Sequence, residues 1–317
     1  MIVRWSLEEL PAVLREVGID HPLLVAGERW SPLQIPASAR WTEVPSHRIH
    51  VPPTVDGILA VGGGSAIDTA KAASGASALP LVSVPTTYSG AEWTPTFGVR
   101  SPDRRMVGGG AGARLAGIVY DVDLTLDLPR AETVGTALNA LAHCAEALYV
   151  RGRNDEGDRA ALDGARLIAD SLPRVVEAPH DTTGRRDLLE GACLAGQALA
   201  LAGLGLGHAL AQTLGGRYGL PHGAMNALSL PAALRFNERF APEAVARLAT
   251  AIRADGDAAA KVEELARLGG FGRLRDFGVP EEDLRELAEA AAARPGNLSN
   301  PRAATPSDLY ELLESLL

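Results

Sequence analysis

The sequence predicts an α/β domain built on a parallel sheet, followed by an all-helical domain. Residues 1 to about 128 alternate short apolar runs with turns rich in glycine and proline, and helical stretches separate the runs. Strands that alternate with helices are typical of a parallel sheet. From Pro129 onward the strand patterns disappear and helical segments follow one another. We therefore expect two domains, residues 1–128 and 129–317.

Short apolar runs bounded by turn residues predict the strands of the first domain, and periodic stretches predict its helices. The expected strands are residues 23–26, 58–61, 81–84 and 118–120, and the expected helices are residues 7–17 and 66–76. The second domain has eight expected helices, which end at proline, glycine or asparagine, for example at Gly215-Gly216 and Pro280. Their residue ranges are 131–151, 155–177, 186–214, 224–236, 242–254, 257–268, 281–293 and 306–317.

Composition narrows the class of protein. The net charge of −9 and the absence of a basic stripe argue against a nucleic-acid partner. No apolar run reaches the length of a membrane span, and the first residues lack the pattern of a signal peptide. Cys144 and Cys193 lie in helical contexts typical of small buried thiols. We expect a soluble, cytoplasmic protein.

A glycine turn follows the strand at residues 58–61. Gly62, Gly63 and Gly64 let the backbone turn sharply, and Ser65 is placed to cap the helix behind them. A helix N-terminus behind such a turn offers backbone N–H groups to a phosphate. The spacing differs from the dinucleotide fingerprint G-x-G-x-x-G, so a tight turn without a ligand remains an alternative.

A loop rich in hydroxyl groups follows the next strand, at residues 85–92. Ligands of open α/β sheets bind beyond the carboxyl ends of the strands, where this loop lies. Thr86, Thr87 and Ser89 can hydrogen-bond phosphate, ribose or carboxamide groups. The alternative is a polar loop whose side chains satisfy the local backbone.

The helical half contains a candidate metal or catalytic site. Asn139 and His143 lie four residues apart and therefore share one helix face. His208 and His222 flank the expected helix break at Gly215-Gly216. Three imidazoles with an open position can hold zinc or another divalent ion. The alternative for each histidine alone is a hydrogen-bonded structural role.

Taken in order, these segments resemble the iron-containing alcohol dehydrogenase superfamily, and they are most similar to its maleylacetate reductases. The glycine turn, with Asp68 and Lys71, is similar to the pyrophosphate-binding turn of that family. Residues 85–95 are similar to P-T-T-Y-A-G-S-E-M-T-P, and residues 139–149 follow N-A-x-A-H-x-x-E-x-L-Y. Residues 207–208, 214–216 and 220–224 complete the pattern. The resemblance implies a dinucleotide-binding, dehydroquinate synthase-like α/β domain and a helical domain that carries the substrate or metal site.

The resemblance also implies the ligand positions. An Asp and three His hold the metal of the family, and the matching residues are Asn139, His143, His208 and His222. Asparagine removes the anionic ligand, and the similar subgroup is associated with metal-independent reduction, so we do not expect a required iron. Zinc on the three histidines remains an alternative. Gln212 stands where many members carry a histidine that is thought to relay a proton.

NAD(P)H is the cofactor that the resemblance implies. The residues expected to contact it are Gly62, Gly63, Gly64, Ser65, Asp68, Thr86, Thr87, Ser89, Thr94 and Arg105. After the first strand, Gly27 stands where members that prefer NAD often carry an acidic residue. Arg29 could pair with the 2′-phosphate of NADP, whereas Glu28 argues against it, so the sequence leaves both cofactors open.

The function implied is hydride transfer from NAD(P)H to a small oxo-substrate, as in the reduction of maleylacetate to 3-oxoadipate late in aromatic degradation. His143, His208 and His222 would stabilise the negative charge that develops. Arg104, Arg105 and Arg235 are candidates for pairing with substrate carboxylates. Two alternatives are a metal-dependent alcohol or aldehyde dehydrogenase and an inactive protein that binds a nucleotide. A homodimer is expected, with neither nucleic acid nor membrane as partner.

Overall fold

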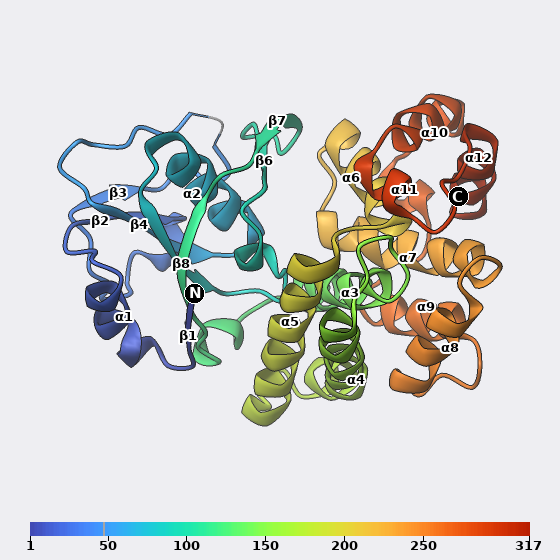
Figure 1. Cartoon of the computed structure of the whole chain (residues 1–317), viewed down its shortest axis with the longest axis horizontal. Helices are drawn as coiled ribbons and strands as arrows, with labels where there is room; N and C mark the ends of the chain where they lie inside the picture. The colour runs from blue at the N-terminus through green and yellow to red at the C-terminus, as the bar shows by residue number, and fades with distance from the viewer. Residues whose placement is uncertain (47) are drawn as a thin grey trace. The chain divides into compact units, whose positions relative to one another are not determined.

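The computed structural model describes residues 1–46 and 48–317 (Figure 1). The chain divides into two compact units, Met1–Leu128 and Pro129–Leu317. The first unit contains a six-stranded sheet in the order β1-β8-β5-β4-β2-β3, in which every neighbouring pair is parallel. The bounds of the six strands are β1 Ile2–Arg4, β2 Pro22–Ala26, β3 Ala39–Trp41, β4 Gly57–Gly62, β5 Pro80–Pro85 and β8 Arg114–Val119. The predicted parallel sheet is therefore confirmed.

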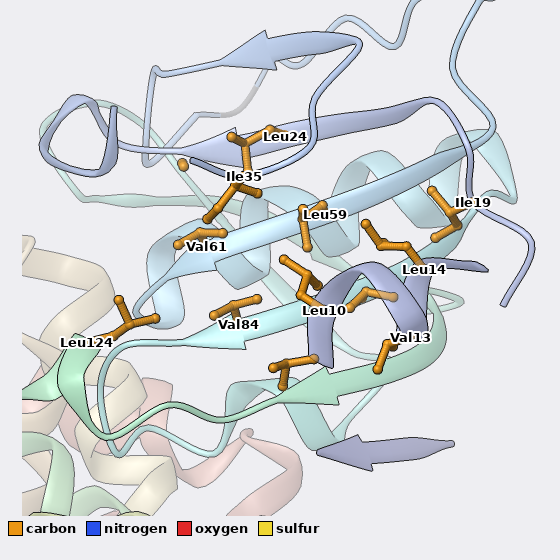
Figure 2. Close-up of a cluster of buried hydrophobic side chains, with 13 residues drawn as sticks. Leu10, Val13, Leu14, Ile19, Leu24, Ile35, Leu59, Val61, Val84 and Leu124 are labelled. Atoms are coloured by element: carbon orange, nitrogen blue, oxygen red, sulfur yellow. The ribbon is translucent and has the colours of Figure 1, made fainter. Parts of the chain in front are cut away.

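Two apolar clusters cover the two faces of this sheet. On one face α1 (Leu10–Glu16) packs Leu10 and Leu14 against Leu59 of β4 and its neighbours (Figure 2). On the other face α2 (Gly64–Ser77) packs Ile67 against the strand residues that point to that face, such as Ile58. Side chains alternate between the faces of a strand, so a strand covered on both sides needs apolar residues at every position. This explains the uninterrupted apolar runs of β2 and β4.

Some elements of the first unit differ from the prediction. The predicted helix 7–17 is a 3₁₀ turn, η1 (Leu7–Glu9), followed by α1. Helix α2 begins at Gly64 with Gly63 as its N-cap residue and without a side-chain capping bond, so the predicted cap at Ser65 is wrong. An antiparallel pair, β6 (Phe97–Arg100) and β7 (Met106–Gly110), was not predicted. Three consecutive glycines in β7 hide it, because glycine is a poor strand former.

Further 3₁₀ turns follow strands of the first unit. They are η2 (Glu28–Trp30), η3 (Ala91–Trp93) and η4 (Asp123–Thr125). Two more, η5 (Leu274–Phe277) and η6 (Glu281–Asp283), lie in the second unit.

The described residues of the second unit contain helices and no strand, as predicted. Helix α3 (Arg130–Ala147) is buried along almost its whole length and packs against α4, α5 and α7. Cys144 lies within it, and both cysteines are buried as expected. The other helices are α4 Asp155–Glu177, α5 Thr182–Ala202, α6 Leu206–Tyr218, α7 His222–Glu238, α8 Pro242–Ala251, α9 Ala258–Leu268, α10 Leu284–Ala292, α11 Pro295–Ser299 and α12 Pro306–Ser315.

The predicted helix 186–214 is wrong in both its extent and its end. It is two helices, α5 and α6, which meet at an angle of 102°. The break lies at Gly203, whose φ of +94° suits glycine. Helix α6 then continues through Gly215 and Gly216, where a stop was predicted, and ends at Gly219 in the left-handed conformation.

Within the described residues, no single helix is both long and apolar enough to cross a membrane. The bent pair of α5 and α6 passes that test by length and composition alone.

Candidate functional site

At the glycine turn that ends β4, backbone without side chains lies close to neighbouring residues. Gly62 has a φ of +147°, and a Cβ at this position would lie 2.8 Å from the Cβ of Ala66. A Cβ at Gly63 would lie 2.8 Å from Cγ2 of Thr87. A Cβ at Gly64 would make only ordinary contacts, the nearest with Oγ of Ser89 at 3.5 Å. A side chain at Gly62 would therefore displace α2, and one at Gly63 would displace the loop that follows β5.

That loop is held against the glycine turn and carries an unsatisfied hydroxyl group. The backbone N–H of Thr86 donates to the carbonyl oxygen of Gly62 at 3.1 Å. Oγ1 of Thr87 is buried and has no hydrogen-bond partner among the described residues. Together with the N-terminus of α2, which lacks a side-chain cap, this hydroxyl fits a phosphate or ribose oxygen. The residues present therefore fit a dinucleotide.

Asp68 and Thr94 are joined through a third residue, Lys71. The Lys71 side chain is 1% exposed, and its Nζ lies 3.3 Å from Oδ1 of Asp68 and 3.4 Å from Oγ1 of Thr94. It also donates to the carbonyl oxygen of Thr96 at 2.9 Å. Burial raises the pKa of the Asp68 carboxyl, and the charge of Lys71 opposes that rise. This cluster ties α2 to the segment that leads into β6.

The candidate arginines lie near acidic or aromatic partners. Arg105, 65% exposed in its side chain, is 3.6 Å from Asp103 in the turn between β6 and β7, beside Arg104. Arg235 on α7 pairs with Glu263 at 2.6 Å. The guanidinium carbon of Arg29 lies 4.5 Å from the ring centroid of Trp30.

In the second unit, the structure brings together the three histidines and Asn139. Asn139 and His143 lie on α3, His208 lies in the first turn of α6, and His222 is the first residue of α7. The rings of His143 and His208 are stacked with centroids 4.6 Å apart, and those of His208 and His222 are 5.7 Å apart. His143, His208 and Asn139 are buried, whereas His222 is partly exposed.

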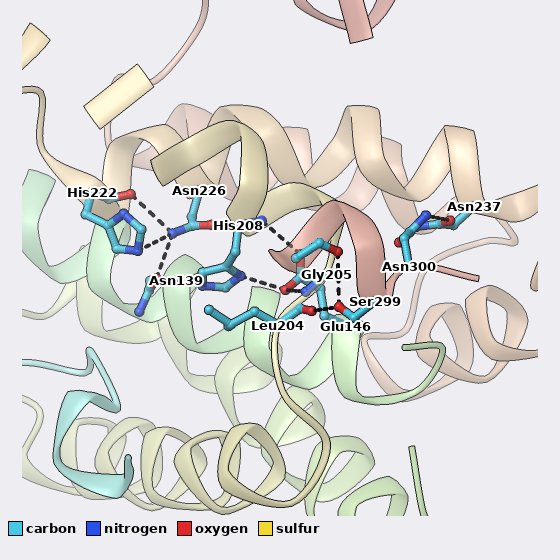
Figure 3. Close-up of polar contacts among 11 residues, drawn as sticks. Asn139, Glu146, Leu204, Gly205, His208, His222, Asn226, Asn237, Ser299 and Asn300 are labelled. Atoms are coloured by element: carbon cyan, nitrogen blue, oxygen red, sulfur yellow. Dashed lines mark hydrogen bonds and ion pairs between the residues drawn. The ribbon is translucent and has the colours of Figure 1, made fainter. Parts of the chain in front are cut away.

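A chain of hydrogen bonds crosses this cluster from Glu146 to His222 (Figure 3). Oε2 of Glu146 lies 2.7 Å from Nδ1 of His208, whose Nε2 lies 3.3 Å from Oδ1 of Asn139. The same Oδ1 accepts a hydrogen bond from Nδ2 of Asn226 at 2.7 Å. Nδ2 of Asn226 also lies 3.0 Å from Nε2 of His222. We call these five side chains the polar chain.

The amide groups determine where the hydrogens of the polar chain lie. Oδ1 of Asn139 can only accept, so His208 must carry a hydrogen on Nε2. Nδ2 of Asn226 can only donate, so Nε2 of His222 accepts. Glu146 also accepts the backbone N–H groups of Gly205 at 2.6 Å and of His208 at 2.9 Å, so both of its oxygens act as acceptors. His208 therefore donates from both ring nitrogens.

His143 differs from His208 in its surroundings. Burial lowers the pKa of His143 well below its usual value, and the neighbouring His208 and His222 lower it further. Its Nδ1 has no hydrogen-bond partner among the described residues. His143 is therefore a neutral imidazole at pH 7.

Sequence reasoning missed Glu146 and Asn226 as members of this site. Both are fully buried, and both follow a candidate histidine on the same helix face: Glu146 three residues after His143, and Asn226 four residues after His222. The spacing of polar residues behind each histidine was the signal that could have identified them.

These side chains, as they are arranged, do not fit a divalent cation. A shared metal requires an open lone pair on each ligand. The Nε2 of His208 carries a hydrogen, and Asn226 donates to Asn139 and His222. No group of three or more His, Cys, Asp or Glu suited to a metal is found among residues 1–46 and 48–317.

Comparison with known proteins gives consistent matches over most of the chain. Family models for "Iron-containing alcohol dehydrogenase" and "Fe-containing alcohol dehydrogenase family, C-terminal" match residues 51–113 and 133–317. The maleylacetate reductase of Pseudomonas knackmussii is 34% identical over 97% of this chain and 92% of its own. That of Sphingobium indicum is 38% identical over 81% of this chain and 73% of its own.

Two solved structures show the same fold. The maleylacetate reductase of Agrobacterium tumefaciens has a TM-score of 0.86 and 30% identity, and the match covers 100% of this chain and 95% of that one. An iron-containing alcohol dehydrogenase of Corynebacterium glutamicum has a TM-score of 0.88 and 32% identity, with 100% and 94% covered.

Proposed function

Because the chain belongs to the iron-containing alcohol dehydrogenase family and is an oxidoreductase, we propose that it reduces maleylacetate to 3-oxoadipate with NAD(P)H. Relatives with that activity cover most of the chain. The observation that carries the proposal is the polar chain, which equips His208 to donate a proton without a metal ion.

The glycine turn and the loop after β5 hold the cofactor. The bare backbone of Gly62 and Gly63, the hydroxyl of Thr87 and the N-terminus of α2 bind its pyrophosphate and ribose oxygens. Gly64, Ser65, Asp68, Thr86, Ser89, Thr94 and Arg105 complete the proposed set. Bound NAD(P)H supplies a hydride, which is the part of the chemistry that side chains cannot perform.

His208 supplies the proton that balances the reaction. When hydride adds to one carbon of the substrate's C=C bond, the electron pair moves toward the conjugated ketone and forms an enolate. Transfer of the Nε2 proton from His208 to the other carbon forms the saturated product. Glu146 stabilises the imidazolium before transfer, because its carboxylate lies 2.7 Å from Nδ1.

His143 and His222 act as neutral hydrogen-bonding groups toward the enolate oxygen. The lowered pKa of His143 makes it unsuited to hold a proton at pH 7. A neutral donor can still stabilise developing negative charge in a buried site. The three histidines therefore have two roles: His208 transfers a proton, and His143 and His222 stabilise the negative charge on the enolate oxygen.

The test is turnover in metal-free protein. Protein purified with a chelator is assayed for oxidation of NADH and NADPH with maleylacetate and with a panel of simple aldehydes. We expect maleylacetate turnover that added chelator does not reduce. Aldehyde turnover that chelator abolishes would instead identify a metal-dependent alcohol dehydrogenase.

Single substitutions test the residues. His143→Ala, His208→Ala and His222→Ala should each lower kcat while the Kd of the cofactor stays within about twofold, because the cofactor set lies on other residues. Turnover that survives all three changes would contradict the assignment of the histidines.

A further inference from the structure

Asn226 lies in the polar chain between Asn139 and His222, which are two of the family's ligand positions. Its Nδ2 is 2.7 Å from Oδ1 of Asn139 and 3.0 Å from Nε2 of His222 (Figure 3). Asn139 and His222 match the first and last positions of the Asp and three-His ligand set. One amide nitrogen thus binds both atoms that a metal ion would need.

We propose that the amide of Asn226 replaces the metal ion of the family, holding Asn139 and His222 together and keeping both from ligating a cation. Asn226 is then a positioning residue of a metal-free site. The role of this site in catalysis rests on the proposed function. The exclusion of metal does not, because it is a property of the protein without substrate.

The orientation of the Asn226 amide follows from its neighbours. The opposite orientation would set Oδ1 of Asn226 against Oδ1 of Asn139, so two acceptors would face each other without a hydrogen between them. In the observed orientation Nδ2 uses both of its hydrogens. Oδ1 of Asn226 has no hydrogen-bond partner among the described residues, which is the cost of this arrangement.

A cation and this amide compete for the same lone pairs. A bound zinc ion lies about 2.0–2.2 Å from nitrogen and oxygen ligands. The hydrogens of Asn226 point at the same two acceptor atoms and carry positive partial charge. A cation would have to displace them and would gain no anionic ligand, because position 139 is a neutral amide. Both changes disfavour metal binding.

The place of Asn226 on α7 holds its side chain next to His222. It lies four residues after His222 on α7, so both residues share one face of the helix. The side chain is fully buried, and its Nδ2 also lies 3.3 Å from the carbonyl oxygen of His222. Its removal would leave a space beside Asn139 and His222 rather than a new contact.

The experiment measures Zn²⁺ affinity, by calorimetry and by competition with a chromophoric chelator, in the chelator-treated full chain. Wild type is compared with Asn226→Ala, which removes the amide, and Asn226→Asp, which keeps the shape but replaces the N–H donors with a carboxylate. We expect both variants to bind Zn²⁺ at least tenfold more tightly than wild type. Asn226→Asp serves as the test if Asn226→Ala fails to fold.

Asn237→Ala is the matched control. Asn237 is also a fully buried asparagine on α7, but its amide pairs with Asn300 at 3.0 Å, away from the histidines. Its Zn²⁺ affinity should equal that of wild type. A Zn²⁺ affinity that neither Asn226 variant raises above that of wild type would overturn the inference, even if maleylacetate turnover were found. Failure of turnover with a clear gain in Zn²⁺ affinity would overturn only the proposed function.

Discussion

Glu146 and His208 are joined twice, through the backbone and through the side chain. Oε1 of Glu146 accepts the backbone N–H of His208 at 2.9 Å, and Oε2 lies 2.7 Å from Nδ1 of the same residue. A carboxylate from α3 therefore fixes both the position of the first turn of α6 and the orientation of the imidazole that the turn carries.

Glu146→Gln should lower both stability and activity. Glutamine has one acceptor oxygen, whereas Glu146 uses both oxygens to accept the N–H groups of Gly205 and His208. A buried donor left unsatisfied should lower the free energy of unfolding by about 2 kcal/mol. Loss of the charge that stabilises the imidazolium should lower kcat about 100-fold. Urea unfolding and steady-state kinetics measure the two effects.

Asp158→Asn provides the control for that prediction. Asp158 is a buried carboxylate that pairs with Arg247 at 2.6 Å and is not part of the polar chain. It should lose stability while kcat stays close to that of wild type. An equal loss of kcat in both variants would mean that Glu146 acts only through stability.

The lowered pKa of His143 should make the free energy of unfolding depend on pH. Burial lowers its pKa well below 6.5 in the folded protein, so the unfolded chain binds a proton that the folded chain does not. The buried neutral His143 therefore does not reduce the free energy of unfolding above pH 6.5. The free energy of unfolding falls as pH drops below that value, because the unfolded chain then gains a proton. His143→Gln should lose less stability than wild type between pH 7.5 and pH 5, as measured by urea unfolding. Equal slopes in the two proteins would contradict the burial of a neutral His143.

Thr87→Val should weaken cofactor binding without weakening the fold. The Thr87 hydroxyl has no hydrogen-bond partner among the described residues, so a methyl group in its place breaks no bond in the free protein. Loss of one hydrogen bond to the cofactor should raise the Kd of NADH about tenfold. Fluorescence titration and thermal unfolding measure both quantities.

Thr213→Val is the comparison for Thr87. Its hydroxyl donates to the carbonyl oxygen of Ala209 on α6, in the other unit. It should leave the Kd of NADH unchanged. An unchanged Kd in Thr87→Val as well would remove Thr87 from the cofactor set.

Lys71→Met should destabilise the first unit strongly. Lys71 is 1% exposed in its side chain and donates to Asp68, Thr94 and Thr96, so its removal leaves three acceptors without their cation. We expect a loss of about 3 kcal/mol in the free energy of unfolding. Asp68→Asn combined with Lys71→Met should lose less than the sum of the two single changes. Strict additivity would show that the two residues do not interact.

Much of the fold could be predicted from the sequence, because the central strands are buried on both faces. Strands β2, β4 and β5 therefore appear as apolar runs that composition alone identifies. Strands β1 and β3 have three residues each, too few for a pattern. The break at Gly203 was missed because apolar residues continue through it at helical spacing, whereas Gly203 adopts a positive φ and Gly205 is extended.

The sequence identified candidate site residues by their type, but it did not predict which of them contact one another. The histidines and Asn139 stood out because few polar residues interrupt the apolar helices around them. Glu146 and Asn226 look like ordinary polar positions of α3 and α7. Their importance depends on packing between helices that are distant in sequence, and one chain without its fold does not show which helices meet.

The capping of α6 by Glu146 also has a consequence for how the protein can be divided. A fragment that begins after α5 would contain His208 and His222 but would lack the carboxylate that accepts the N–H groups of Gly205 and His208. Its first turn would fray in isolation, since a helix with unsatisfied N-terminal donors is weakened. Adding a separate fragment that contains α3 should restore the helix. The first turn of α6, with His208 on it, is thus part of a structure that needs two distant pieces of the chain to associate.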